Sequence, residues 1–530
     1  MTLSSHPILC VSDLTVALPA NADRAFAVEG VSLELGPSEI LCVVGESGSG
    51  KSVLSSAVMG ALPRGLTLTR GAITLGGDDL ARQSQAAWRA IRGRRIAMIP
   101  QEPMAALNPS MRVGRQIEEV FAIHGRLDRA ARRAEALRLI GEMHLPDPAR
   151  IAAAYPHQLS GGQCQRVCIA MALALNPEVL IADEPTTALD VTTQAQMLKL
   201  IRELRDRHGQ GVMFITHDLG VVADIADRIA VMEKGRLVEI GPAAQVLHSP
   251  AHPYTRALIA AVPSFTPKPR AKIVAKDGPG ACLRVTGLTK SYGATHALKG
   301  ADLTVERATT VSVVGESGSG KSTLARLLVR LTEPTSGQAL VNGDDLARLS
   351  GQRLRQARRS IQMIFQDPFG SLNPRRTVGA IIARAAVLAG DDRGAARGRA
   401  EELLRRVGLG ASAYGRPPSA FSGGQRQRVG IARALAMRPD ILIADECLSA
   451  LDVSVQAQIL ALLRELQTEL GLTIVFITHD LRVAAQVGDR IAVMKAGEIV
   501  EIGEAASVLE APQHPYTRAL LAAAPGRGAI

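Results

Sequence analysis

Short and almost wholly apolar runs recur along this chain, and each ends at glycines or at acidic residues. Residues 40–44 and 310–314 are two such runs, and residues 179–182 and 441–444 are two more. Apolar runs of this length with turn signals at their ends predict strands that are buried on both faces of a sheet. Residues 108–155 differ, because Arg, Ala and Leu recur there at helical spacing. The pattern therefore predicts buried strands together with a separate helical segment.

The runs at 40–44 and 310–314 lead into one repeated sequence, Gly-Glu-Ser-Gly-Ser-Gly-Lys-Ser, and then into helix-like stretches at 53–59 and 323–329. A glycine-rich loop between a strand and a helix is the context of a P-loop, in which backbone N–H groups and the helix N-terminus point at phosphates. Its lysine reaches the β- and γ-phosphates, and its serine hydroxyl binds Mg²⁺. We therefore expect two phosphate sites, formed by Gly45, Ser47, Gly48, Ser49, Gly50, Lys51 and Ser52, and by Gly315, Ser317, Gly318, Ser319, Gly320, Lys321, Ser322 and Thr323.

Further motifs follow both loops in the same order. They are a glutamine after an apolar run, a Ser-Gly-Gly-Gln sequence, an Asp-Glu pair after an apolar run, an Ala-Leu-Asp sequence and a Thr-His-Asp sequence. Most of these motifs differ by 262 positions between the halves and the P-loop lysines by 270, so the first half carries eight extra residues after its P-loop. The order predicts a tandem duplication. Its motif residues are Gln101, Ser160, Gly161, Gly162, Gln163, Asp183, Glu184, 188–190 and His217, and then Gln366, Ser422, Gly423, Gly424, Gln425, Asp445, Glu446, 450–452 and His479.

The length of the chain agrees with a duplication, because 530 residues suit two domains of about 250 residues each. Residues 263–280 are rich in Pro, Gly and Lys and show no periodicity, which predicts a linker. We therefore expect one domain at 1–262 and a second at 281–530.

The residue types of the motifs indicate phosphoryl chemistry. An aspartate at the end of a buried strand can hold Mg²⁺ opposite a P-loop, and the glutamate after it can accept a proton from an attacking water. The histidines follow β-like runs, where an imidazole could contact the γ-phosphate, and each Ser-Gly-Gly-Gln precedes a helix-like run whose N–H groups attract anions. Taken singly, Ser-Gly-Gly is also a common turn, and His217 could be a core histidine.

Charge and cysteines exclude several other classes. A net charge of +11 could suggest nucleic acid or an anionic membrane surface, but the Arg-rich segments 92–95 and 353–359 lack the aromatic residues that stack on bases. We expect solvated helix faces and no nucleic-acid partner. The six cysteines include no CxxC pair, so we expect neither a disulfide framework nor a metal cluster, and Cys164 and Cys168 read as small buried thiols. No run reaches the roughly 20 apolar residues of a membrane-spanning helix, and no secretory signal is apparent, which predicts a cytoplasmic chain.

The motifs together resemble the ATP-binding cassette (ABC) ATPases, in a tandem arrangement that covers nearly the whole chain. The Ser-Gly-Gly-Gln signature is the specific feature, since many P-loop proteins share the other motifs. The resemblance implies an α/β fold of two P-loop domains, each with a mostly parallel core sheet, an antiparallel β piece near its start and a helical subdomain, which is residues 108–155 in the first copy. Gln101 would be the hinge between that subdomain and the core.

In this family two cassettes close head to tail around two ATP molecules, so each P-loop faces the signature of the other cassette. Carried over, one site combines Lys51, Ser52, Gln101, Asp183, Glu184 and His217 with Ser422, Gly423, Gly424 and Gln425. The other combines Lys321, Ser322, Gln366, Asp445, Glu446 and His479 with Ser160, Gly161, Gly162 and Gln163. The expected Mg²⁺ ligands are Ser52, Gln101, Asp183, Ser322, Gln366 and Asp445. Both sites keep the catalytic glutamate and histidine, so both are expected to hydrolyse ATP.

Two differences between the copies are expected to matter. Tyr292 matches the aromatic residue that stacks on adenine in the family, whereas Leu18 takes its place in the first copy, which predicts weaker adenine binding there. The second copy has Cys447 where the family usually has proline. A redox role for this cysteine and a tolerated small residue are the two interpretations.

The sequence His-Pro-Tyr-Thr-Arg-Ala-Leu follows each cassette, at residues 252–258 and 514–520. It resembles the C-terminal element of the ATP-binding subunits of oligopeptide and dipeptide importers, with the first half similar to their D type and the second to their F type. Fused forms import peptides, glutathione or peptide-like antibiotics. The resemblance implies two membrane permease subunits, docked after Gln101 and Gln366, an extracytoplasmic substrate-binding protein, and a peripheral location on the cytoplasmic face of the inner membrane.

Two alternatives remain open. A tandem-cassette translation factor acts on ribosomes, but it needs a long charged helical arm between its cassettes, and residues 263–280 are short and rich in Pro and Gly. An importer of another small solute is the second alternative. The transported substrate is not predicted by this sequence.

Overall fold

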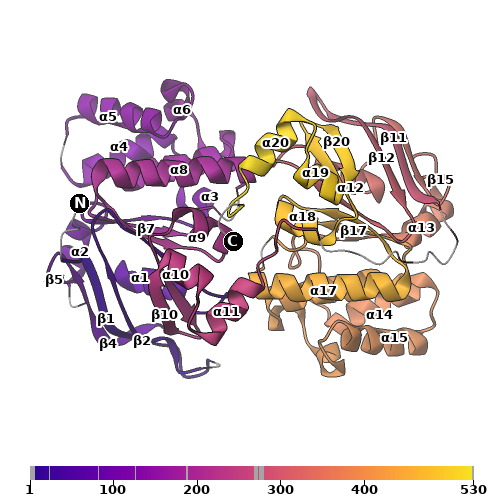
Figure 1. Ribbon diagram of the computed structural model, residues 1–530, viewed down its shortest axis with the longest axis horizontal. Coiled ribbons are helices and arrows are strands. Elements are labelled where there is room, and N and C mark those ends of the chain that lie inside the picture. Colours follow the sequence, from indigo (N-terminus) through magenta and orange to yellow (C-terminus); the bar gives the residue numbers. More distant parts are fainter. Residues whose placement is uncertain are drawn as a thin grey trace. The chain divides into compact units, whose positions relative to one another are not determined.

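The computed structural model describes residues 6–527 except 23, 82, 126, 187–188, 268–272, 274–277, 279 and 450. The chain divides into two compact units, residues 1–262 with 525–530, and residues 263–524 (Figure 1). Each unit holds one P-loop and is described by itself. Ala188, Ala450 and most of the predicted 263–280 linker lie outside the described residues.

The first unit contains two sheets. The antiparallel sheet has the order β2-β1-β4-β5, with β1 at Leu9–Ala17, β2 at Phe26–Leu35, β4 at Thr67–Leu75 and β5 at Asp78–Asp79. The core sheet has the order β10-β9-β3-β8-β7-β6 and is parallel except for the β10–β9 pair. Its strands are β3 (Ile40–Val44), β6 (Ile96–Ile99), β7 (Val179–Asp183), β8 (Gly211–Ile215), β9 (Arg228–Glu233) and β10 (Arg236–Pro242).

Strand β3 shows why the apolar runs are continuous. Ile40, Cys42 and Val44 belong to the hydrophobic core on one face of the sheet, which the helices α7, α8 and α9 complete. Leu41 and Val43 belong to the core on the other face, together with α1 and the antiparallel sheet. All five side chains are buried, because a parallel strand covered on both faces has no solvent side.

The helices of the first unit are listed here with their bounds: α1 (Lys51–Val58), α2 (Gln85–Ile91), α3 (Pro103–Ala106), α4 (Val113–Ile123), α5 (Arg129–Glu142), α6 (Pro148–Ala153), the 3₁₀ helix η1 (Pro156–Gln158), α7 (Gly161–Leu173), α8 (Val191–His208), α9 (Leu219–Ile225), α10 (Ala243–His248) and α11 (Pro253–Ala260). Helices α4, α5 and α6 form the subdomain predicted at residues 108–155, and Figure 1 shows them grouped on one side of the unit. Helix α1 begins two residues before the predicted stretch, because the loop ends at Gly50 with φ 101°.

The second unit repeats this plan. Its antiparallel sheet is β12-β11-β14-β15 and its core sheet is β16-β17-β18-β13-β19-β20. The strands are β11 (Ala281–Tyr292), β12 (Thr295–Glu306), β13 (Thr310–Val314), β14 (Ser336–Val341), β15 (Asp344–Asp345), β16 (Ile361–Ile364), β17 (Ile441–Asp445), β18 (Thr473–Ile477), β19 (Arg490–Lys495) and β20 (Glu498–Glu504). The helices are α12 (Lys321–Leu328), α13 (Gly351–Ser360), α14 (Val378–Ala389), α15 (Arg393–Arg406), η2 (Ala411–Gly415), η3 (Pro418–Ala420), α16 (Gly423–Ala436), α17 (Val453–Leu470), α18 (Leu481–Val487), α19 (Ala505–Glu510) and α20 (Pro515–Ala522).

The predicted architecture is confirmed in both units: a mostly parallel core sheet, an antiparallel sheet at the start and a helical subdomain. Of the helices in the described part of the chain, none combines the length and hydrophobicity needed to cross a membrane.

Candidate functional site

The P-loop of each unit curls around its own lysine. Lys51 Nζ donates to the carbonyl oxygens of Gly45 at 2.7 Å and Glu46 at 2.9 Å, and Lys321 Nζ makes the same contacts at 2.8 and 2.7 Å. Both lysines are buried. Gly45 has φ 151°, and a Cβ there would lie 2.2 Å from the carbonyl oxygen of Met232, so only glycine fits. The loop therefore holds a cation and a helix N-terminus together, which is the arrangement that binds phosphate.

The serine after each lysine contacts the aspartate at the end of β7 or β17. Ser52 Oγ donates to Asp183 Oδ1 at 3.3 Å, and Ser322 Oγ donates to Asp445 Oδ1 at 3.1 Å. Burial is the main cause that raises the pKa of both carboxyls, and the neighbouring Glu184 raises that of Asp183 further. A buried carboxylate beside a hydroxyl is a set of hard oxygen donors, and a bound cation would stabilise its charged form against burial. These atoms fit Mg²⁺.

The glutamate that follows the aspartate lies at the centre of a polar cluster. Glu184 has φ 46°, a strained backbone for a residue with a side chain, and its carboxylate accepts from Gln101 Nε2 at 3.0 Å. His217 Nδ1 lies 3.3 Å from the same carboxylate. Burial acts to lower the pKa of His217, but the adjacent Glu184 outweighs it and raises the pKa. The pair can therefore share a proton.

The second unit repeats the cluster with small differences. Glu446 has φ 44°, accepts from Gln366 Nε2 at 2.8 Å and lies 3.9 Å from His479 Nδ1 and 4.0 Å from Lys321 Nζ. The neighbouring His479 lowers the pKa of Glu446, which keeps the carboxylate ionised. In both units the glutamine contacts the glutamate, while its role as a Mg²⁺ ligand stays a prediction.

The Ser-Gly-Gly-Gln sequences begin helices α7 and α16. Ser160 Oγ accepts from Gln163 N at 3.3 Å and Gln163 Oε1 accepts from Ser160 N at 3.0 Å, a reciprocal capping box that Ser422 and Gln425 repeat at the same distances. A Cβ on Gly162 would lie 2.7 Å from Thr193, so the second glycine packs on the next helix. The first glycine, Gly161, has open space where its Cβ would be, which leaves the helix start accessible.

The strand register aligns Tyr292 with Leu18. Tyr292 pairs with Thr295 in the hairpin of β11 and β12, and Leu18 N donates to Ala25 O at the corresponding end of the first hairpin. The Tyr292 side chain is 49% exposed, and only Lys290 Nζ, 5.0 Å from the ring centroid, lies over it among the described aromatic contacts. Its ring is therefore available to a planar ligand.

Sequence reasoning missed Arg24, which lies in the longer hairpin loop of the first unit. Its guanidinium donates to the carbonyl oxygen of Gly48 in the P-loop at 2.6 Å. The tight turn at Gly293 leaves no room for an equivalent in the second unit. A single arginine in a loop belongs to no sequence motif, so the contact of Arg24 with the P-loop could not be predicted from the sequence.

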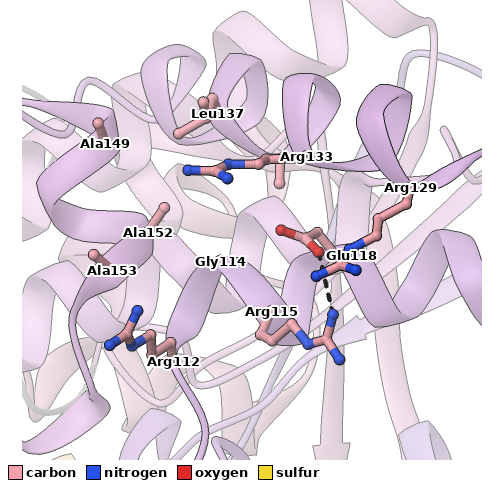
Figure 2. Close-up of a pocket in the computed structure, with 11 residues that line it drawn as sticks. Arg112, Gly114, Arg115, Glu118, Arg129, Arg133, Leu137, Ala149, Ala152 and Ala153 are labelled. Atoms are coloured by element: carbon pink, nitrogen blue, oxygen red, sulfur yellow. Dashed lines mark ion pairs between the residues drawn. The ribbon is translucent and has the colours of Figure 1, made fainter.

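A second feature that the sequence did not indicate is a pocket of about 390 Å³ in the helical subdomain of the first unit. Figure 2 shows the side chains of Arg112, Arg115, Arg129 and Arg133 around it, with Glu118 paired to Arg115 at 3.8 Å. The pocket is therefore basic.

In the second unit a tyrosine lies against the equivalent glycine. A Cβ on Gly114 would lie 2.7 Å from Ala152 Cβ, whereas a Cβ on the equivalent Gly379 would lie 2.2 Å from the ring of Tyr414. Ala152 and Tyr414 hence occupy the same place against the same glycine. The Arg397 guanidinium covers the Tyr414 ring at 5.2 Å.

Five of the six cysteines are buried, and Cys10 is partly exposed. All six are free, and burial raises the pKa of Cys168 and of Cys447 to about 12. A thiol that stays protonated at neutral pH is a poor nucleophile, so burial favours the interpretation of Cys447 as a tolerated small residue. Among the described residues, no group of His, Cys, Asp and Glu has the arrangement of a metal cluster.

Comparison with known proteins agrees with this geometry. The model of the ABC transporter family matches residues 28–187 and 298–449, and the model of the oligopeptide/dipeptide transporter C-terminal region matches residues 238–284 and 500–529. The chain is 46% identical to the glutathione import ATP-binding protein GsiA of Salmonella choleraesuis over 563 residues, covering 99% of this chain and 90% of that protein. It is 44% identical to GsiA of Escherichia coli over 569 residues with the same coverage.

Among solved structures, an ATP-binding cassette dimer bound to ADP and Pi is similar at 33% identity, with a TM-score of 0.40, over 42% of this chain and 98% of that chain. The cassette matches cover more than half of the chain, and the full-length relatives are importer ATPases. The chain therefore belongs to the ABC transporter family, as a tandem ATPase of its peptide and glutathione importer group.

Proposed function

We propose that this chain energises the import of peptides or peptide-like solutes through two separate membrane permease subunits, served by an extracytoplasmic binding protein. The observation that carries the proposal is that each cassette is followed by the oligopeptide/dipeptide C-terminal region, and that relatives similar along the full chain are named as glutathione import ATP-binding proteins. The chain would work at the cytoplasmic face of the inner membrane. The two cassettes span residues 1–262 and 281–530, joined by the 263–280 linker.

Each cassette supplies the groups for hydrolysis of the γ-phosphate. We assign Lys51 and Lys321 to the β- and γ-phosphates, since their ammonium groups already lie inside the loops that would cradle them. Ser52 with Asp183, and Ser322 with Asp445, would hold Mg²⁺, which would neutralise phosphate charge when bound. The hydroxyl and carboxylate contacts at 3.3 and 3.1 Å support this assignment.

The glutamates are assigned as proton acceptors for the attacking water. Glu184 and Glu446 each accept a hydrogen bond from a glutamine, which orients the carboxylate, and each has a histidine beside it. The histidines would contact the γ-phosphate from the opposite side. Gln101 and Gln366 lie between the core sheet and the helical subdomain in sequence. A change at the glutamate would therefore move the glutamine and, through it, the helical subdomain.

The signatures would complete each site from the other cassette, Ser422 to Gln425 for the Lys51 site and Ser160 to Gln163 for the Lys321 site. Their open helix starts support an anion-binding role. ATP would then close the cassettes, and hydrolysis would release them and move the permeases between inward-facing and outward-facing states.

We place the permease contacts after Gln101 and Gln366. Met104 and Phe369 follow these glutamines and are 49% and 52% exposed, which leaves both apolar side chains available to a partner. The basic pocket at Arg115 and Arg133 lies in the helical subdomain that follows Met104 in the first cassette. An acidic side chain on the permease that meets this cassette would complement it.

The test is a co-purification with an ATP-locked variant. Glu184→Gln/Glu446→Gln, isolated from its native cells with ATP in mild detergent, should bring two polytopic membrane proteins with it. The same variant with Lys51→Ala/Lys321→Ala, which cannot hold ATP, is the matched control. Ribosomal proteins without membrane partners would overturn the proposal in favour of a translation factor. The wild-type chain, assembled with the same membrane partners, should then hydrolyse ATP faster when its binding protein carries a peptide or glutathione; stimulation by an unrelated solute alone would identify an importer of another class.

A further inference from the structure

The His-Pro-Tyr-Thr elements form the first turns of helices α11 and α20. Tyr254 N donates to His252 Nδ1 at 3.2 Å, and Tyr516 N donates to His514 Nδ1 at 3.1 Å, so each histidine caps its helix. The proline occupies the first helical position, where its missing N–H costs nothing. These residues fix where the helix begins and therefore where the tyrosine points.

The hairpin of strands β9 and β10 contacts both this element and the P-loop. Glu239 on β10 accepts from Ala251 N at 2.7 Å and His252 N at 3.0 Å, directly before α11. In the turn that leads into β10, Gly235 N donates to the carbonyl oxygen of Ser49 in the P-loop at 2.9 Å.

The second unit has the same three contacts. Glu501 accepts from Gln513 N at 2.8 Å and from His514 N at 3.1 Å, and Gly497 N donates to Ser319 O at 2.9 Å. In both copies the hairpin therefore connects the P-loop to the C-terminal His-Pro-Tyr-Thr element.

The tyrosine hydroxyl closes this connection. Glu46 N donates to Tyr254 Oη at 3.1 Å, and Glu316 N donates to Tyr516 Oη at 3.2 Å, across 208 and 200 residues of sequence. The carbonyl oxygen of that same residue, Glu46 or Glu316, accepts from the P-loop lysine. One residue thus lies between the tyrosine hydroxyl and the lysine ammonium.

We propose that Tyr254 and Tyr516 are positioning residues for nucleotide binding, which fix the start of the P-loop so that the lysine alone moves to the phosphates. When nucleotide binds, the ammonium must leave the carbonyl oxygens of Gly45 and Glu46, or Gly315 and Glu316. With its N–H held by the tyrosine, that backbone segment keeps its orientation while the lysine leaves. Without the hydroxyl, the N–H loses a partner in a partly buried place and the loop start can rotate away.

The inference concerns ATP binding and does not depend on which solute is imported. It assigns a role to the C-terminal region beyond a covering for the sheet. If the His-Pro-Tyr-Thr element moved relative to the core sheet, the backbone that holds the lysine would move with it. The reason is that the hairpin, the element and the P-loop are joined by hydrogen bonds.

The test uses full-length chains with one working site, because Lys321→Ala leaves the Lys51 site and Lys51→Ala leaves the Lys321 site. In the Lys321→Ala chain, Tyr254→Phe should raise the Kd for ADP about two- to tenfold, the loss expected for one hydrogen bond, and Tyr516→Phe should not. In the Lys51→Ala chain the two substitutions should exchange their effects.

This crossover separates positioning from a general loss of structure. Tyr414→Phe removes a hydroxyl elsewhere in the second cassette and should change the Kd in neither chain. Unchanged affinity with both tyrosine variants would overturn the proposal. Equal weakening in both chains, whichever tyrosine is changed, would do the same, since it would indicate a global effect.

Discussion

Exchanging the side chains at one equivalent position should exchange the nucleotide affinities of the two cassettes. The position is Tyr292 at the end of β11 and Leu18 after β1, which the hairpin register places in correspondence. If the tyrosine stacks on adenine, the second P-loop site binds nucleotide more tightly than the first. Tyr292→Leu should then weaken the second site, and Leu18→Tyr should strengthen the first.

The magnitude follows from what each substitution removes. Tyr292 is 49% exposed, so its ring is accessible to a base. Loss of one aromatic–base stack by alanine substitution costs about 1–3 kcal/mol, which is about a 5- to 150-fold change in Kd for Tyr292→Ala. Leucine keeps apolar contact and loses the ring geometry alone, worth about 0.5–1.5 kcal/mol, so Tyr292→Leu should weaken binding about two- to tenfold.

The assay is an equilibrium titration with ADP of chains that keep one site. The Lys51→Ala chain reports on the site with Tyr292, and the Lys321→Ala chain on the site with Leu18. We expect a lower Kd for the first of these chains, a loss of the difference with Tyr292→Leu, and an unchanged Kd when Tyr292→Leu is placed in the Lys321→Ala chain. Equal affinities of the two parent chains, or no effect of Tyr292→Ala, would refute the stacking argument.

Three further predictions concern the glutamates, the ion pair and the packing. Glu184→Gln with Glu446→Gln should retain ATP binding but slow phosphate release about 10²- to 10⁴-fold, because the proton acceptor is lost; a rate near wild type contradicts its role. The pKa of His479 is raised above its ordinary value of 6.5, so its contribution to stability is complete below pH 6.5 and is lost as pH rises through the raised pKa. The pKa of Glu446 is lowered below 4.5, so its contribution is complete above pH 4.5 and is lost as pH falls through the lowered pKa. The unfolding free energy lost in His479→Asn should therefore be largest between these values and shrink by pH 9, whereas a loss independent of pH would exclude the ion pair. Tyr414→Ala should destabilise the second unit by about 2–4 kcal/mol in denaturant unfolding, since it opens the space that is a pocket in the first; a change below about 0.5 kcal/mol would mean that the ring is not packed.

The sequence predicted what depends on local pattern. The apolar run at residues 40–44 coincides with β3, because a strand buried on both faces needs an unbroken run. The aspartate and glutamate at the end of β7 follow from the same reasoning. The contact of Asp183 with Ser52 agrees with it, since β3 and β7 flank β8 in a parallel array and end at one edge of the sheet.

Contacts that depend on the path of the whole chain were not predicted. Nothing local marks Tyr254 as a partner of Glu46, because 208 residues separate them and the element resembles any proline-started helix. The pocket beside Gly114 depends on the size of one residue, Ala152, in a helix that packs from the far side. Arg24 reaches the P-loop only because its hairpin loop folds back over it.

The two cassettes are copies of one another, so contacts present in both can be separated from contacts present in one. Contacts around the P-loops recur in both copies, including the serine with the aspartate, the glutamine with the glutamate, and the tyrosine with the P-loop amide. The tyrosine contact recurs although the first copy has eight more residues between its P-loop and its signature, so the added length is absorbed away from it. The copies differ at the expected adenine position, at Arg24 and in the pocket of the helical subdomain. We infer that both sites use one hydrolytic chemistry but load nucleotide with different affinities.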